Sequence, residues 1–168
     1  MIHSSFTEKY LKLHQFQGQS NDCGPYCTAT LLNLILNTQI QGETLAQEMN
    51  KISWKGPFPL IKRIKNWATF PWGIVEEFKI KGVPARWNLF TNPDSLYANL
   101  VRNSHTIIII GELKPKAWAH YLILTAQDHE KGWGFVNSSK PAAEIDWIPS
   151  AQFDQQWNAY GRISILVR

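Results

Sequence analysis

Residues 17–36 have the sequence QGQSNDCGPYCTATLLNLIL, which begins polar and ends as an apolar run. Leucine and isoleucine recur at helical spacing after Pro25 and are frequent enough to cover most of the helix surface. This pattern predicts a central helix that begins at Asp22, is buried on most sides and ends near Asn37. The elements before and after it are expected to pack around this helix.

The first turn of this helix carries a cysteine next to glycine and proline. If Asp22 caps the helix, Cys23 lies in the first turn, where Pro25 is tolerated because its missing N–H would have no intrahelical partner. The positive end of the helix dipole favours a thiolate, and Gly24 would let a substrate backbone approach closely. We therefore predict Cys23 as a nucleophile, and Cys27, one turn further on, as a buried packing residue.

A nucleophilic thiol needs a base, and the chain has five histidines. His120 directly precedes the apolar segment 121–124, at the beginning of a predicted strand. It is predicted as the general base, with a purely structural histidine as the alternative. The other four lie near the beginning of the chain, at a predicted helix-to-strand junction or in a polar turn: His3, His14, His105 and His129.

Residues 119–126 and 133–137 are predicted to form a β-hairpin, because the segment between them is polar and ends in glycine. If Ala126 lies opposite Lys131, the ladder places His120 opposite Asn137 on the same face. A slip of one residue would move these two side chains to opposite faces. Asn137 is thus predicted to orient the imidazole, and the alternative is a simple strand-ending turn.

These residues together predict acyl transfer to sulfur. Cys23 and His120 would form a thiolate–imidazolium pair, the sulfur would attack a carbonyl to give an acyl-enzyme, and His120 would protonate the leaving group. The side-chain amide of Gln17 and the backbone N–H of Cys23 are expected to donate to the oxyanion. Asn137 is neutral, so it would orient the histidine without adding a charge that competes for the proton.

The remaining periodicities complete an α+β fold class. Further helices are predicted at 43–52, 71–81 and 93–103, and further strands at 83–89, 106–113 and 162–167. Helices first and strands afterwards predict an N-terminal helical half, with its buried central helix, packed on a C-terminal antiparallel β-sheet. No linker divides the 168 residues, so a single domain, 1–168, is expected.

Composition limits the partners and cofactors. The net charge is +4, but the basic residues are scattered, and the densest cluster, at residues 62–65, fits a solvated helix face. No nucleic-acid partner is therefore expected. Two cysteines without a nearby histidine provide neither a disulfide framework nor a zinc site, so no cofactor or metal is predicted. Without a signal peptide or a long apolar run, a cytoplasmic protein with no membrane contact is expected; the sequence leaves the oligomeric state open.

The order of these motifs resembles a known family. Gln17, six residues before Cys23 in Asp-Cys-Gly-Pro, followed by His120 on a strand and then Asn137, looks like the papain-like cysteine peptidase superfamily. The closest branch is that of the bacteriocin leader (double-glycine) peptidase-like domains, which similarly have a Gly-Val-Pro-Ala-like turn, here 82–85, and a late helix, here 153–157. That branch usually carries Asp-Pro at the third position, where this chain has Asn137-Ser138; papain itself uses Asn.

The resemblance implies the papain-like fold and, residue by residue, Cys23 as nucleophile, His120 as base, Asn137 as orienting residue and Gln17 as oxyanion donor. The expected function is a cysteine peptidase-like thiol hydrolase acting on a peptide or protein substrate. An acyltransferase or a deamidase would use the same triad, because fold does not choose among these reactions. A catalytically inactive peptide-binding domain is a second class, and a nucleic-acid-binding domain is a distant third.

Overall fold

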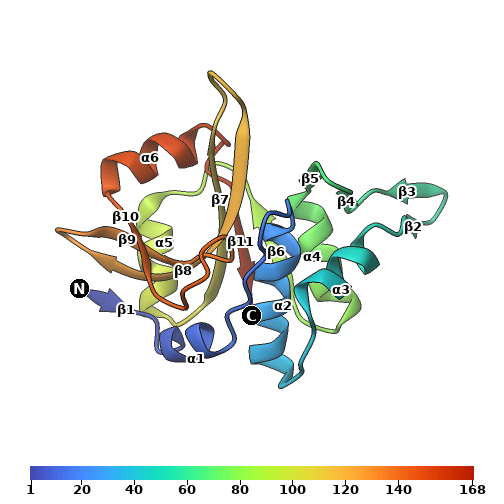
Figure 1. The fold of residues 1–168 in the computed structure, drawn as a ribbon, viewed down its shortest axis with the longest axis horizontal. Coiled ribbons are helices and arrows are strands. Elements are labelled where there is room, and N and C mark those ends of the chain that lie inside the picture. The colour runs from blue at the N-terminus through green and yellow to red at the C-terminus, as the bar shows by residue number, and fades with distance from the viewer.

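The computed structural model describes residues 1–168, except for the side chain of Lys55. The chain forms six helices, which Figure 1 labels. The helices predicted at 43–52, 71–81 and 93–103 end three, one and two residues earlier than expected. The chain also forms an additional short helix near its beginning. The helices are α1 (Thr7–Lys12), α2 (Cys23–Leu36), α3 (Gly42–Met49), α4 (Pro71–Ile80), α5 (Pro93–Val101) and α6 (Ser150–Asn158).

A seven-stranded sheet is built mainly from the second half of the chain, in the order β10-β9-β8-β7-β11-β6, and β1 from the beginning of the chain pairs with β8. All of its pairs are antiparallel. Its strands are β1 (Ile2–His3), β6 (Ala85–Asn88), β7 (His105–Glu112), β8 (Trp118–Asp128), β9 (Gly132–Val136), β10 (Asp146–Ile148) and β11 (Ser164–Val167). The predicted α+β class, with N-terminal helices on a C-terminal antiparallel sheet, is confirmed.

The first half of the chain is less uniformly helical than periodicity predicted. Two small hairpins lie between α3 and α4, made of β2 (Ser53–Lys55) with β3 (Phe58–Leu60) and of β4 (Arg63–Ile64) with β5 (Ala68–Thr69). The basic cluster here was expected on a solvated helix face, and that expectation is wrong. Lys62 and Arg63 are 4% and 6% exposed, because each pairs with a buried or half-buried carboxylate.

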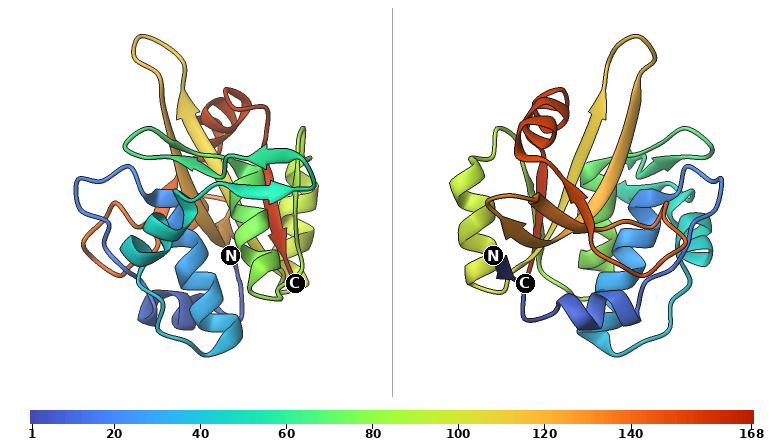
Figure 2. Two further views of the ribbon diagram at one scale, coloured as in Figure 1. Left: turned by 90° about the vertical axis from the view of Figure 1, so that its right-hand side faces the viewer. Right: turned by 60° about the vertical axis from the view of Figure 1, so that its left-hand side comes forward.

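The sheet is covered on both faces, and the alternation of β7 shows why. Ile107 and Ile109 belong to the apolar cluster beneath α2, α3 and α4, whereas Ile108 and Ile110 belong to the cluster beneath α5 and α6. Successive side chains of a strand point to opposite faces, so an unbroken apolar run indicates a strand buried on both sides. Figure 2 shows the sheet between these two groups of helices.

Helix α2 forms the centre of the N-terminal layer, as its apolar composition predicted. Ten of its residues, from Cys23 to Asn33, are buried, and it contacts α3, α4 and β8. It ends where Asn37 takes a left-handed conformation, which Asn tolerates better than most residues. Among the described residues, none of the helices has the length and hydropathy that would let it cross a membrane.

Candidate active site

Cys23 is the first residue of α2 and is 7% exposed. Its thiol is in hydrogen-bonding contact with the imidazole of His120. Burial by itself raises the pKa of the Cys23 thiol, but the hydrogen bond and charge of His120 and backbone hydrogen bonds at Tyr121 and Gly24 outweigh it, so that the pKa is lowered. The geometry therefore favours a thiolate at the beginning of this helix.

His120 lies on β8, half-buried, with Cys23 on one side of its ring and Asn137 on the other. Its Nε2 is 2.7 Å from Asn137 Oδ1. A carbonyl oxygen can only accept, so Nε2 carries a hydrogen and Nδ1 is the nitrogen left for the sulfur. Burial lowers the pKa of His120, but the hydrogen bond and charge of Cys23, then Asn137 and the charge of Asp146, raise it overall.

Cys27, one helical turn beyond Cys23, has the opposite environment. Its thiol donates to the backbone oxygen of Tyr121 at 3.4 Å and is 1% exposed. Burial and the neighbouring charge of Cys23 raise the pKa of Cys27 well above that of an ordinary thiol. The structure thus places Cys27 in the core, as the helical pattern predicted.

The β8–β9 hairpin brings His120 and Asn137 together by a register that differs from the predicted one. Asp128 pairs with Gly132, so the turn lies two residues later along β8 than expected. A regular ladder from that turn would place His120 and Asn137 on opposite faces. An irregularity between Leu124 and Ala126 shifts the pairing by one residue, which returns the two side chains to the same face.

Gln17 is held in the loop before α2 by both ends of its side chain. Its Nε2 donates to the backbone oxygen of Ser20 at 2.7 Å, and its Oε1 accepts from Ser138 Oγ at 2.6 Å. Its backbone N–H also donates to the oxygen of Ser138 at 2.9 Å. The residue after Asn137 therefore fixes the loop that precedes Cys23, and one N–H of the Gln17 amide is not used by the Ser20 contact.

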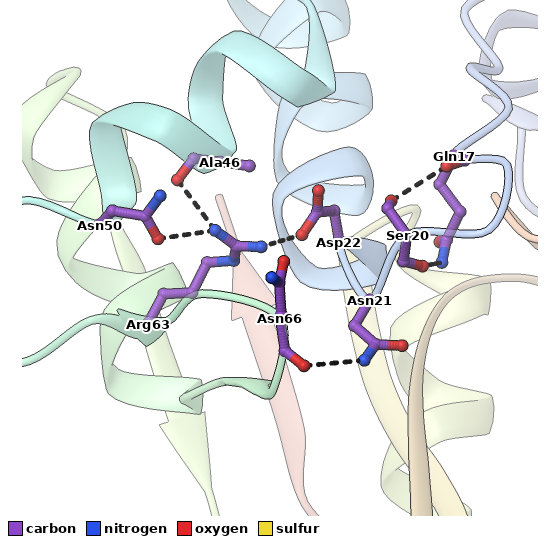
Figure 3. A network of polar contacts seen from close by, with 8 residues as sticks. All are labelled: Gln17, Ser20, Asn21, Asp22, Ala46, Asn50, Arg63 and Asn66. Carbon is purple, nitrogen blue, oxygen red and sulfur yellow. Dashed lines mark hydrogen bonds and ion pairs between the residues drawn. The ribbon is translucent and has the colours of Figure 1, made fainter.

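The predicted cap at Asp22 takes a different form. Asp22 occupies the N-cap position and Cys23 lies in the first turn of α2, as predicted, but the Asp22 side chain makes no cap hydrogen bond. Its carboxylate instead accepts from Arg63, whose guanidinium also donates to Asn50 Oδ1 at 2.6 Å and to Ala46 O at 3.3 Å. Figure 3 shows this buried arginine joining β4, α3 and the residue before the cysteine.

A second contact joins the loop before α2 to the turn between β4 and β5. Asn21 Nδ2 donates to the backbone oxygen of Asn66 at 3.1 Å, between β4 and β5. A Cβ on Gly24 would lie 2.8 Å from the side chain of Thr69. The absence of a side chain at Gly24 therefore accommodates Thr69, a role that differs from the close substrate approach predicted for it.

A cavity of about 520 Å³ borders the site on the side of the imidazole and the amide. His120 and Asn137 are among its lining residues, and Cys23 is not. Trp118 and Trp147 provide apolar surface, and Lys140 and Asp146 provide charge. No group of three potential metal ligands occurs among the described residues.

Two groups near Asn137 were not singled out by the sequence. His14, set aside because it lies early in the chain, has its Nε2 3.1 Å from the backbone oxygen of Asn137. Asp146 accepts a hydrogen bond from Asn137 Nδ2 at 2.6 Å. Neither residue lies in a recognisable motif, and only tertiary contacts reveal them. His3, His105 and His129 have other partners, namely Met1, Tyr10 and Glu130.

Comparison with known proteins supports the fold. No family model and no curated protein sequence matches this chain. Among solved structures, it is similar to a protein from Bacillus anthracis whose crystal structure is described as that of a "putative C39-like peptidase", with a TM-score of 0.66 and 14% identity over 88% of each chain. At this identity the likeness concerns the fold alone, and at that level the resemblance stated from the sequence is confirmed.

Proposed function

We propose that the protein is a cysteine peptidase-like thiol hydrolase that cleaves peptide or amide bonds of a peptide or protein substrate. The observation that carries this proposal is the chain of contacts from Cys23 through His120 to Asn137. A thiol with a lowered pKa, a base with a raised pKa and a neutral amide that orients the base are the groups that acyl transfer to sulfur needs.

In the proposed first step, the Cys23 thiolate attacks the substrate carbonyl and forms a C–S bond. The carbonyl oxygen becomes an oxyanion, which the backbone N–H of Cys23 and the free N–H of the Gln17 amide would stabilise. The tetrahedral intermediate collapses as the C–N bond breaks, and His120 transfers its proton to the departing amine. The amine then leaves, and the acyl group stays on Cys23 as a thioester.

In the second step, water replaces the amine. His120, now neutral, takes a proton from the water as the oxygen attacks the thioester carbonyl. The C–S bond breaks, a carboxylic acid leaves, and the thiolate–imidazolium pair is restored.

Mass spectrometry after treatment with a peptide-like thiol-reactive probe tests this proposal. We expect the probe to label Cys23 and not Cys27, because the pKa of one thiol is lowered and that of the other is raised. Cys27 is thus an internal control within the same helix. In His120→Ala the labelling of Cys23 should fall at least tenfold at neutral pH, since its hydrogen bond and charge are lost.

Two results would contradict the proposal. The first is equal labelling of Cys23 in wild type and His120→Ala, which would show that the imidazole does not activate the sulfur. The second is equal labelling of the two cysteines in the folded wild type, which would favour a peptide-binding domain without turnover. Circular dichroism of each variant checks that the fold is retained.

A further inference from the structure

The side chain of Asn137 has partners on every side. Its Oδ1 accepts from His120 Nε2 at 2.7 Å, from the backbone N–H of Ser139 at 2.9 Å and from Ser139 Oγ at 2.8 Å. Its Nδ2 donates to Asp146 Oδ2 at 2.6 Å. Asn137 is 8% exposed, so these protein groups, rather than bulk water, determine how the amide is oriented.

Asp146 reaches this amide from the neighbouring strand. It begins β10 and pairs with Phe135 of β9, and Asn137 lies two residues beyond Phe135, directly after the strand ends. Residues two positions apart along a strand share a face, and diagonal neighbours are within reach of each other's side chains. The β9–β10 pairing therefore aims a carboxylate at the Asn137 amide.

A carboxylate in this position distinguishes the two ends of the amide. If the amide were rotated by half a turn, Oδ1 would face the carboxylate of Asp146, and two acceptor oxygens would meet without a proton between them. Nδ2 would then face the Nε2–H of His120 and the N–H of Ser139, where donors would meet donors. In the observed orientation of the Asn137 amide, each of these groups has a hydrogen-bonding partner. Asp146 is the charged group among them, and it favours this orientation over the rotated one.

We propose that Asp146 is a positioning residue that acts through Asn137, fixing the amide so that its oxygen holds the His120 ring toward Cys23. This inference rests on the proposed function. Asp146 would thus join Cys23, His120 and Asn137 as a further residue of the site, and it contacts Asn137 rather than the sulfur. The hydrogen bond of Asn137 to a carboxylate is of the charge-assisted kind, which is shorter and stronger than a neutral one.

The charge of Asp146 also acts on the imidazolium. Burial lowers the pKa of His120, and the charge of Asp146 is one of the causes that raise it, after the hydrogen bond and charge of Cys23 and the hydrogen bond of Asn137. Lys140 is the other charged residue that lines the adjoining cavity. Removing Asp146 should therefore weaken the orientation of the ring and also lower the pH at which the imidazolium loses its proton.

A double-mutant cycle tests whether Asp146 acts through Asn137. The variants are Asp146→Ala, Asn137→Ala and the double variant, and the measurement is the rate constant for labelling of Cys23 by the thiol-reactive probe. We expect Asp146→Ala to lower this rate constant about tenfold in the wild-type background, the size typical of one hydrogen bond to a charged group. In the Asn137→Ala background it should change the rate constant less than twofold. Equal effects in both backgrounds, or none in either, would overturn the inference.

NMR titration of His120 supplies a readout independent of activity. The pKa of His120 should be lower in Asp146→Ala than in wild type, because a negative charge near the imidazolium is lost. Glu144→Ala is the matched control, since it removes an exposed carboxylate two residues away and should leave both the titration and the labelling unchanged. An unchanged His120 titration in Asp146→Ala would overturn the inference. Unselective labelling of the wild type would instead count against the proposed function.

Discussion

Cys23 and Cys27 are one turn apart on the same helix, yet their thiols have opposite acidities. Both are buried, which opposes ionisation, but only Cys23 has an imidazole partner that compensates for burial. The sulfur of Cys27 instead donates to a backbone oxygen, a contact that favours the protonated form. At the scale of the residue, the tertiary partner rather than the cysteine's place in the helix decides which thiol is reactive.

This contrast predicts a pH dependence for alkylation of Cys23. The pKa of Cys23 is lowered, so the thiolate should form, and the rate with iodoacetamide should rise, at a lower pH than for an ordinary free thiol. In His120→Ala the burial remains and the compensating partner is gone, so the midpoint should move to higher pH than in wild type. Site-resolved mass spectrometry over a pH series measures both midpoints.

Cys27 provides the reference for this measurement. Its alkylation should stay slow across the range in which Cys23 reacts, because its pKa is raised well above the ordinary value. A wild-type midpoint for Cys23 that is the same as in His120→Ala would contradict the assignment of the shift to the imidazole. Cys27→Ala keeps Cys23 as the one remaining cysteine and should show the wild-type midpoint.

At the scale of the element, the β8–β9 hairpin decides whether His120 meets Asn137. The turn and the ladder near it would separate the two residues, and the irregularity between Leu124 and Ala126 brings them back to one face. A bulge inserts one unpaired residue, so it reverses the parity of every later pair. Beyond the bulge, the observed pairing of β8 with β9 differs from the predicted pairing by two residues. An even difference leaves His120 and Asn137 on the same face of the sheet.

The loop before α2 is also held by Arg63 of β4, which connects it to α3. Its side chain is 3% exposed and its pair with Asp22 is joined to Asn50 and Ala46 of the neighbouring helix region. Arg63→Ala should lower the free energy of unfolding by about 3 kcal/mol, because breaking a buried ion pair leaves its partner uncompensated. Urea denaturation measures this loss, and labelling of Cys23 should slow as the loop loosens.

Two further variants sharpen this prediction. Lys65→Ala removes an exposed charge two residues away and should change stability by no more than about 0.5 kcal/mol. Arg63→Lys should recover little of the loss, since an ammonium cannot reach Asp22 and Asn50 together as the planar guanidinium does. If Arg63→Ala and Lys65→Ala have equal stability, the arginine does not join these elements as described.

At the scale of the whole molecule, the sheet separates two apolar layers, and the candidate site combines residues that belong to both of them. Cys23 belongs to the layer of α2, whereas His120 shares its face of β8 with Leu122, in the layer of α5 and α6. The relative position of sulfur and imidazole thus depends on how both layers pack on the sheet. A change in either layer that shifts α2 against β8 should affect reactivity from a distance.

Trp157 tests the packing of the second layer. It is fully buried, stacks with Phe153 at a ring distance of 5.2 Å and donates to the backbone oxygen of Ile163. Trp157→Ala should lower the free energy of unfolding by about 3–5 kcal/mol, as large-to-small changes in cores do. Trp54→Ala, at a position 68% exposed, should change it by about 0.5 kcal/mol or less. Similar urea midpoints for the two variants would contradict this account of the core.

The sequence by itself determined which segments are helices and strands wherever the apolar pattern is long. The run after Cys23 predicted a buried helix, and the segment 106–113 predicted a strand, because local periodicity follows from the backbone geometry of a few consecutive residues. The small hairpins between α3 and α4 escaped prediction, since strands of two or three residues leave too short a pattern.

Which side chains meet was decided only by the tertiary structure. The position of Cys23 at the beginning of a helix and the order Cys23, His120, Asn137 could be predicted from the sequence. The catalytic roles of these residues stay predictions. The pairing of Arg63 with Asp22, the bulge that sets the face of Asn137 and the carboxylate of Asp146 behind it were not visible. Each depends on strand register or on packing between distant segments, and such contacts are selected by the whole core rather than by neighbouring residues.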